Sequence, residues 1–587
     1  MLPDHMRREG KTLRNDKCII GLVIEDIGST YARDLIRDTM DSIPEGDAIR
    51  LVVLAGKYDE PGIDLHEYRQ VYNLIHHLEE ICEFDGFIVS CAPFADIMKR
   101  AASDENGRHF LDIPKVYVGD GPRDETIVKC DNEIGIRSGI DFLININGCR
   151  KLCMLGGRDD LYDAIKRKEV FIQGLADNGI EFKEQYFVGT DMSENCIAEA
   201  EHLLDLNPDM DAVFCVNDSS AVGMYAAMKK RGIVPGRDIQ VFGFDNTREA
   251  GTMEPPLSSV GTEGATAGSK TVELLLRKLA GEQTETVILP TRLYGRESLK
   301  YTAYDYTMKD LELPDTAVLD RMFDDCFYRY RNEKYSRENV DLRRLFRAFM
   351  TRLLSAAQRR YMSEGEFQEA LRLVDIFIEN GALEYTDIRK LMKSISRLQD
   401  AINKEKGSIS VNSMINRAFL RIKDKVIEEL AKQRELDQIK RNDSREKLEE
   451  FCLRATDHLG SSGDGFDRII RNLGELGLKD AAFFGFEKPV VYEHDKTVDF
   501  PENIRLYCVV KESMFYVISE NRQSVSVKTM LSRAELAGMN SGILLLPVLC
   551  GSCLYGFLAY GITEDIFDRG LIIATELGRA LYLKDLL

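Results

Sequence analysis

The sequence has no tryptophan and only eight histidines in 587 residues, and no histidine pair stands at a spacing typical of metal ligands. It also contains no Walker loop, no Gly-x-Ser-x-Gly nucleophile elbow, no HExxH zinc motif and no GGDEF run. These absences remove common signatures of hydrolases, metalloenzymes and cyclases. We therefore expect a protein that is not an enzyme, with no catalytic residue, no metal site and no cofactor.

Long hydrophobic runs are also missing. No stretch approaches the roughly 18 uncharged apolar residues that are needed to span a bilayer. Residues 1–17 are too charged to contain the apolar core of an export signal. We expect a cytoplasmic protein without a membrane partner. The alternative of an exported solute-binding protein of a transporter conflicts with the missing signal.

Basic charge is in the minority, with 78 basic against 98 acidic residues and a formal net charge of -20. This balance opposes a general attraction to phosphate backbones, so any contact with DNA must be local. A basic cluster does occur within 343–360, at Arg343, Arg344, Arg347, Arg352, Arg359 and Arg360. Charge spread around a helix is usually a solvated face. Direct DNA binding through these helices is the alternative.

Thirteen cysteines are scattered through apolar segments, where a free thiol behaves as a small buried hydrophobe, and we expect no disulfide framework. Cys550 and Cys553 have the CxxC spacing of a zinc or redox site. Without a second such pair, we interpret residues 551–552 as the two-residue turn of a β-hairpin.

Between residues 18 and 298, short apolar runs alternate with amphipathic stretches, which is typical of parallel strands joined by helices. Most of the runs are continuous and β-branched, so helices should cover both faces of the sheet. The predicted strands are 19–24, 49–54, 86–90, 115–118, 151–155, 212–216 and 239–244. We predict an α/β domain over 17–305.

The pattern changes to long charged helices after this domain. Residues 306–405 are predicted to form a helical bundle, and 406–460 a signalling helix or coiled coil. An apolar seam runs along this helix at Phe419, Ile422, Val426 and Leu430. We favour a parallel dimer stalk over a helix that packs on its own domain. Residues 461–587 are predicted to form an α+β domain with a helix at each end.

Several blocks of the first domain occur in an order that is specific for one family. They include Val-Asn-Asp-Ser at 216–219, Val-Phe-Gly-Phe-Asp at 241–245 and Pro-Pro-Leu-Ser-Ser-Val at 255–260. This domain resembles the sensor domain of the lac-repressor family, which has the periplasmic-binding-protein-like fold of type 1. The resemblance implies two α/β lobes with a ligand cleft at the carboxyl ends of the strands. The N-terminal helix-turn-helix that is usual in the family does not fit before residue 18.

The resemblance also implies ligand-binding residues. Asp26, Ser29 and Tyr31 follow the first strand at the place of a family run, with Tyr31 at an aromatic position that stacks on a sugar ring. A helix cap is an equal alternative for Asp26 and Ser29. Arg167 matches an arginine that grips ligand hydroxyls or carboxylates. A solvated basic face is the alternative for Arg167, since Lys166 and Lys168 flank it.

Two more pairs of polar residues follow strand ends. They are Asn217 with Asp218, and Asp245 with Asn246. Because strand ends converge on the cleft, we expect these side chains to line it, with Asp245 as the principal ligand contact. A helix cap is the alternative for Asn217.

The last domain resembles a GAF module in the order of its elements. Together these features predict a sensing regulatory protein of the transcription-regulator type, with a sugar or related metabolite as effector. Closure of the cleft is expected to act through the helical stalk on the GAF-like domain. The expected partners are the small-molecule effector, a second copy in a homodimer, and an output protein or DNA.

Overall fold

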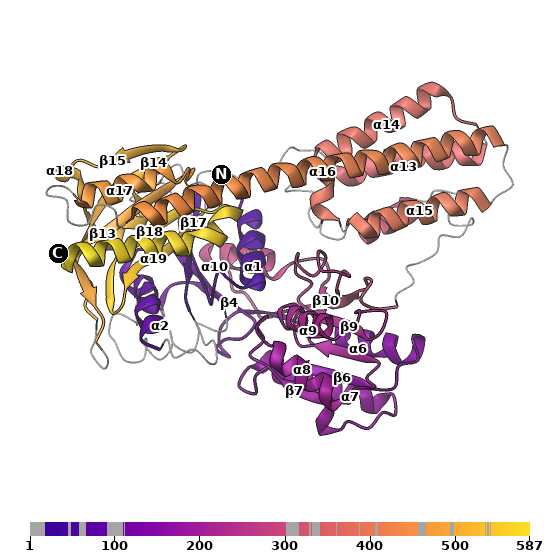
Figure 1. Cartoon of the computed structure of the whole chain (residues 1–587), viewed down its shortest axis with the longest axis horizontal. Coiled ribbons are helices and arrows are strands. Elements are labelled where there is room, and N and C mark those ends of the chain that lie inside the picture. The colour runs from indigo at the N-terminus through magenta and orange to yellow at the C-terminus, as the bar shows by residue number, and fades with distance from the viewer. Residues whose placement is uncertain are drawn as a thin grey trace.

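The computed structural model describes residues 18–44, 48–57, 66–90, 110, 112–300, 316–327, 330, 341–359, 361–386, 388–404, 409–455, 465–493, 498–533, 536, 539 and 542–586. The expected domain boundaries at 17, 306, 406 and 461 lie outside these residues. Figure 1 shows a two-part α/β region, a helical bundle, and a sheet with helices at the C-terminal end of the chain. None of the described helices is both long and apolar enough to cross a membrane.

Lobe 1 is built on a sheet whose own strands pair in parallel, with helices on both faces. One face packs α1 (Thr30–Ser42) and α10 (Ala267–Leu279), and the other packs α2 (His66–Tyr72) and the short helical segments after it. The burial of nearly every strand residue explains the continuous apolar runs in the sequence. The strands are β1 (Cys18–Ile24), β2 (Ile49–Ala55), β3 (Gly86–Ser90), β4 (Lys115–Val118), β5 (Ile127–Cys130) and β11 (Val287–Leu289).

Lobe 2 has its own sheet, in the order β12-β10-β9-β8-β6-β7. Its strands are β6 (Leu152–Gly156), β7 (Phe187–Gly189), β8 (Ala212–Cys215), β9 (Gln240–Phe244), β10 (Ser258–Thr262) and β12 (Thr291–Tyr294). The helices around it are α6 (Ile134–Asp141), α7 (Tyr162–Asp177), α8 (Ile197–Leu206) and α9 (Asp218–Lys230). These two sheets are consistent with the two-lobed, periplasmic-binding-protein-like fold that the sequence predicts.

Within the described residues, the chain passes between the lobes at three points. The first lies between β5 and α6, the second between β10 and α10, and the third between β11 and β12. Such crossing segments are where two lobes can rotate against each other.

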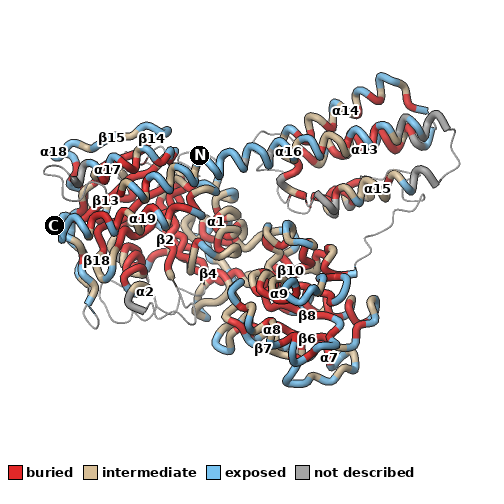
Figure 2. The backbone as a smooth tube through the Cα atoms, viewed as in Figure 1, coloured by how far each residue is buried: buried red, intermediate tan, exposed pale blue. Residues whose placement is uncertain are grey.

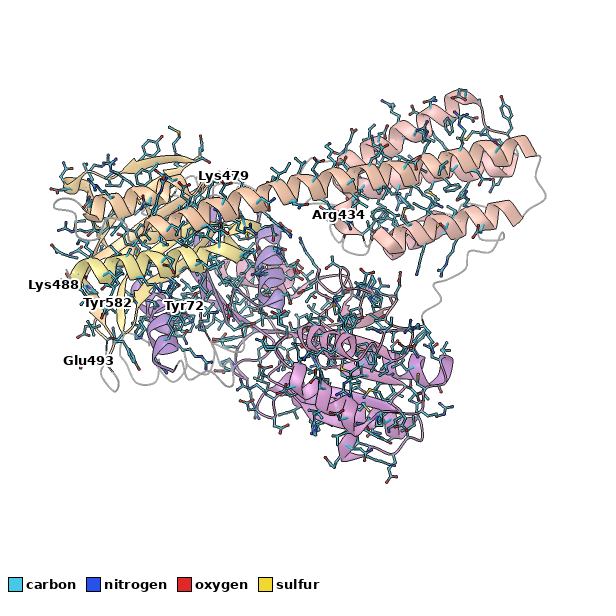
Figure 3. The ribbon with its side chains drawn as sticks, in the orientation of Figure 1. Tyr72, Arg434, Lys479, Lys488, Glu493 and Tyr582 are labelled. Carbon is cyan, nitrogen blue, oxygen red and sulfur yellow. The ribbon has the colours of Figure 1, made fainter. Side chains whose placement is uncertain are left out.

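The helical bundle comprises α12 (Thr316–Cys326), α13 (Leu342–Arg359), α14 (Glu364–Glu379), α15 (Ile388–Lys404) and the first half of α16 (Ile409–Arg454). The predicted seam of α16 packs inside this bundle, because Phe419, Ile422 and Val426 are buried in its core and Leu430 packs against it. This corrects the expectation of a dimer stalk along that seam. In the middle of α16 the described residues are exposed, and Figure 3 shows Arg434 on this stretch between the bundle and the last domain.

The last domain is an antiparallel sheet with helices, as predicted. The hairpin of β17 (Ile543–Cys550) and β18 (Cys553–Gly561) places Cys550 opposite Cys553, with residues 551–552 as its turn. Both cysteines are free thiols. The other elements are α17 (Gly465–Glu475), β13 (Ala481–Val491), β14 (Asn503–Lys511), β15 (Met514–Val517), β16 (Ser524–Ser526) and α19 (Glu564–Leu586).

The sheet of the last domain continues into the sheet of lobe 1. This connection was not predicted from the sequence. Strand β17 pairs in parallel with β2, so that the two sheets form one sheet of twelve strands. Figure 1 shows the yellow C-terminal strands beside the indigo strands of lobe 1, and Figure 2 shows the buried residues continuing across this junction. The hydrophobic cluster on each face of the joined sheet contains residues of both domains.

Candidate functional site

A small hollow of about 130 Å³ lies where the two lobes meet. Helix α1 and the start of α10 form its lobe 1 wall, and the ends of β9 and β10 with the residues after them form its lobe 2 wall. Three predicted site residues line it together: Tyr31 from lobe 1, and Asp245 and Asn246 from lobe 2. Because residues from two crossing segments also line the hollow, rotation of the lobes changes its shape.

Asp245 and Asn246 occupy a strained turn directly after β9. Their backbone φ angles are 98° and 49°, in the left-handed region that residues with a side chain rarely adopt. Hydrogen bonds hold the turn, since the Asn246 N–H donates to Ser259 Oγ at 2.9 Å and Arg296 donates to Asn246 Oδ1 at 2.6 Å. Backbone strain that its surroundings maintain is typical of functional sites.

Arg167, on α7, is buried beside this turn. Its side chain is 6 % exposed, and Nη2 lies 3.6 Å from Asp245 Oδ1. Its Nε donates to Asn132 Oδ1 at 3.0 Å, its Nη1 donates to the Val216 carbonyl at 2.7 Å, and the guanidinium lies 3.6 Å from the centre of the Phe244 ring. The alternative of a solvated basic face is therefore wrong for Arg167. Its planar guanidinium is fixed by these four contacts at once.

Burial dominates the electrostatics of the Asp245 carboxylate. Burial raises its pKa above the ordinary value, and the charge of Arg167 opposes this rise. A ligand that donates hydrogen bonds to Asp245 stabilises its charged form. Asp245 thus offers the hollow a hydrogen-bond acceptor, with the positive charge of Arg167 beside it.

Asp218 stabilises the turn through hydrogen bonds and does not line the hollow. It is 2 % exposed, and it accepts hydrogen bonds from the Thr247 N–H at 2.8 Å and from Ser259 Oγ at 2.6 Å. Burial, followed by the nearby charge of Asp245, raises its pKa to about 7. Gly243 leaves room for this carboxylate, because a Cβ there would lie 2.3 Å from Asp218 Oδ1. The structure thus assigns Asp218 to the support of the site, in place of the expected lining.

Asn217 caps α9, which was the alternative interpretation. Its side chain accepts from the Ser220 N–H at 2.8 Å and donates to the Met192 carbonyl at 2.9 Å. Both ends of the amide are therefore used within lobe 2.

On lobe 1, Asp26 and Ser29 shape the turn between β1 and α1. Asp26 accepts from Lys57 Nζ at 2.6 Å and from the Gly28 N–H at 2.8 Å. Ser29 is the N-cap of α1. Of the three residues predicted here, only Tyr31 is in the wall of the hollow.

Four further carboxylates lie in or near the site and were not predicted from the sequence. Asp34 and Asp38 of α1 line the hollow, and Glu25 and Asp163 lie near it. Glu25 follows β1 directly and accepts from Ser90 Oγ at 2.6 Å, and burial raises its pKa. Asp163, on α7, accepts from Asn132 Nδ2 at 2.8 Å and so orients the amide that holds Arg167. The position rule that selected Asp245 at a strand end also applies to Glu25. Asp163 carries no comparable signal in the sequence.

Three arginines of the basic cluster on α13 are paired with acidic neighbours. Arg343 pairs with Asp324 at 2.6 Å, Arg347 with Asp320 at 2.5 Å, and Arg359 with Glu366 at 2.7 Å. Arg360 lies outside the described residues. In the described part of the chain, no three His, Cys, Asp or Glu side chains are grouped so that they could hold a metal ion.

Residues 140–299 match a family model described as a periplasmic binding protein-like domain. The HTH-type transcriptional regulator CelR of Thermobifida fusca is 31% identical over 193 residues, which cover 32% of this chain and 56% of that protein. The HTH-type transcriptional repressor PurR of Vibrio atlanticus is 26% identical over 241 residues, covering 38% of this chain and 70% of the repressor. The chain thus spans little more than half the length of CelR.

Among solved structures, a transcriptional regulator CelR-cellobiose complex is 22% identical, with a TM-score of 0.40, and the match covers 49% of this chain and 86% of that one. A sugar-binding transcriptional regulator of the LacI family from Enterococcus faecalis is 23% identical, with a TM-score of 0.38. This match covers 49% of this chain and 100% of that one. The chain holds a periplasmic-binding-protein-like domain with homologues among HTH-type transcriptional regulators. These homologues are transcription regulators and not enzymes, which is the class that the sequence predicts.

Proposed function

We propose that this chain is a cytoplasmic sensing protein of the transcription-regulator type, which binds a small polar metabolite between its two lobes. The observation that carries the proposal is Asp245, which lines the hollow between the lobes from a strained turn and is paired with the buried Arg167 of α7. The homologous regulators support it, and one solved relative is a complex with cellobiose.

The chemistry of the hollow favours a ligand with several hydroxyl groups. Asp245 accepts hydrogen bonds, Asn246 both donates and accepts, and Tyr31 supplies an aromatic ring with a hydroxyl. A sugar ring presents hydroxyls at its edge and C–H groups on its face, which match such polar and aromatic groups. We therefore propose a sugar or a related metabolite as the effector.

A thermal-shift screen tests this proposal, because a ligand that binds only the folded chain raises its melting temperature. The screen uses cellobiose, monosaccharides, nucleosides and amino acids. Asp245→Ala should abolish the shift given by the sugar that binds. Asp209→Ala is the matched control on lobe 2, since the Asp209 side chain is 75% exposed. A shift that survives Asp245→Ala undiminished contradicts the proposed site.

We also propose that the last domain is a GAF-like signalling module and that the chain acts as a homodimer. An antiparallel sheet between α17 and α19, entered through the long helix α16, supports the module. Residues of α16 that face away from the bundle offer an apolar contact for a second copy, as at Leu420, Ile427 and Ile439. An output protein or DNA would then bind according to the conformation of this domain.

Direct DNA binding through α13 is the second candidate function, favoured by the homologous HTH-type regulators. Arg344 and Arg352 would then contact phosphates, since Arg343, Arg347 and Arg359 already face carboxylates. A gel-shift experiment at two salt concentrations tests it. Binding that falls steeply with salt supports this function, and no binding at low salt excludes it.

A further inference from the structure

Lobe 1 and the last domain form one structural body. Three residues of β17 pair in register with β2, from Ile543 with Val52 to Leu545 with Leu54. The buried Arg50 of β2 donates to the Leu531 carbonyl at 2.5 Å and to the Leu536 carbonyl at 3.2 Å. Because the sheet and both hydrophobic clusters are shared, rotation between these two parts would break many buried contacts.

Lobe 2 has a separate sheet and two separate hydrophobic clusters. It is joined to the rest of the α/β region through the three crossing segments. If the lobes move when a ligand binds, lobe 2 therefore moves against the combined body of lobe 1 and the last domain.

Helix α1 is the element of that body which contacts lobe 2 across the site. Asp34 Oδ2 accepts from the Arg248 N–H at 2.9 Å, and Asp34 Oδ1 lies 3.8 Å from Arg248 Nε. One turn earlier, Thr30 Oγ1 lies 3.4 Å from Ser219 Oγ at the start of α9. Arg248 follows the strained turn of Asp245, so this contact connects the ligand-binding segment to α1.

The same helix holds the start of α19. Arg37 Nε donates to Glu564 Oε1 at 2.7 Å, and Arg33 Nη1 donates to Asp568 Oδ1 at 2.8 Å. Both guanidinium groups lie 5.6 Å from the centre of the Phe567 ring. Arg37 also donates to Asp34 at 2.7 Å. A continuous row of charges therefore runs from Arg248 on lobe 2 through Asp34 and Arg37 to Glu564 on α19.

We propose that α1 transmits closure of the two lobes to α19 through this row of charges. This mechanism rests on the proposed ligand site and concerns how binding there changes the contacts of α19. When lobe 2 withdraws, Asp34 loses the Arg248 N–H and competes more strongly for Arg37, which weakens the hold of Arg37 on Glu564. The route differs from the one expected from the sequence, through the long helix.

A long-helix route also begins at lobe 2, where Lys393 of α15 pairs with Glu297 at 2.8 Å. From there it would run through the bundle and along α16, whose middle is exposed over several turns. The route through α1 is shorter, because α1 itself contacts both Arg248 of lobe 2 and the start of α19. The two routes can be separated by mutation.

The test cross-links lobe 1 to lobe 2 in the absence of any ligand. A Thr30→Cys/Ser219→Cys double variant of the full chain is oxidised, or joined with a short bismaleimide, and dithiothreitol releases the disulfide form. Hydrogen exchange is then measured over residues 564–580 in the fixed and released states. The wild-type chain, treated in the same way, controls for its own cysteines. We expect exchange in the fixed state to be slower by about two- to fivefold, the size of one partly exposed ion pair.

Two further variants identify the route. Glu564→Gln/Asp568→Asn, at side chains that are 70% and 73% exposed, should remove the difference between the fixed and released states. Lys393→Ala should leave the difference in place. Equal exchange over 564–580 in both states, while exchange of α1 slows on fixation, overturns the proposal, as does a difference that Lys393→Ala removes. Because no ligand enters this test, its failure is distinct from a thermal-shift screen without a hit.

Discussion

Val53 and Leu544 are paired in register on neighbouring parallel strands, although one lies in the first sixty residues and the other in the last fifty. This pairing makes the sensor lobe and the last domain share a sheet. Stability in one should therefore depend on contacts made by the other.

The first prediction concerns Arg50, which is 4% exposed and donates across this junction. Arg50→Ala removes two buried hydrogen bonds from a charged donor, so we expect a loss of about 2–4 kcal/mol in the free energy of unfolding. Native-state hydrogen exchange should show an equal loss of protection in β2 and β17. Arg237→Ala is the control, since this side chain is 67% exposed. Protection lost from β2 alone would contradict a shared unit.

The second prediction follows from the raised pKa of Asp218. Its ordinary value is 3.8 and its folded value is about 7, so the folded chain binds the proton more tightly between these values. Its contribution to stability is complete below pH 3.8 and is lost as the pH rises towards 7. The slope is at most about 1.4 kcal/mol per pH unit.

Urea denaturation at pH 5, 6 and 7 measures this slope. Asp218→Asn should be less sensitive to pH in this window than the wild-type chain. Asp209→Asn serves as the control, because the bond with Lys151 lowers the pKa of Asp209 and its charge does not change above pH 5. If the Asp218→Asn chain keeps the wild-type slope, Asp218 does not titrate as assigned.

The third prediction compares two neighbours on α16. Val426 is 1% exposed in the bundle core, whereas Ile427 is 54% exposed. Val426→Asp buries a carboxylate without a partner and should cost about 3 kcal/mol or more, while Ile427→Asp should change folding stability by less than about 0.5 kcal/mol. Urea titration followed by circular dichroism measures both. Sedimentation of the folded Ile427→Asp chain tests the proposed contact with a second copy. Equal destabilisation by the two variants would contradict the packing of α16.

Much of the fold could be predicted from the sequence, because burial on both faces forces continuous apolar strands. All seven strands predicted in the first domain are present, within one or two residues of their expected ends. The short strands β5, β7 and β11 were not predicted, since a segment of only three or four residues gives little pattern. The seam of α16 was identified correctly, but the pattern of one helix does not reveal which surface covers it.

The site was only partly predictable for a similar reason. A residue's place after a strand end indicates the edge of the sheet on which it lies, which selected Asp245 and Asn246, whereas Tyr31 was selected by the family resemblance. It does not show whether a side chain is already occupied, and Asn217 and Asp218 prove to be held within lobe 2. The pairing of β2 with β17 is a contact between segments that are distant in the sequence. Neither strand has a sequence pattern that identifies the strand with which it pairs.

The last prediction concerns Arg167, where charge alone should not suffice. Its guanidinium donates to Asn132 and Val216, faces Asp245 and lies over the Phe244 ring. The single ammonium of Arg167→Lys keeps the charge but cannot make these contacts together, so we expect a loss of about 1–3 kcal/mol in folding stability. Affinity for the ligand found by thermal shift should fall at least about tenfold, since Asp245 is no longer held in place.

Lys166→Arg, on the same helix but 40% exposed, should alter neither the folding stability nor the affinity. Titration calorimetry and urea denaturation measure the two effects. Wild-type affinity in a destabilised Arg167→Lys chain would assign Arg167 to the folding of lobe 2 and remove it from the ligand site.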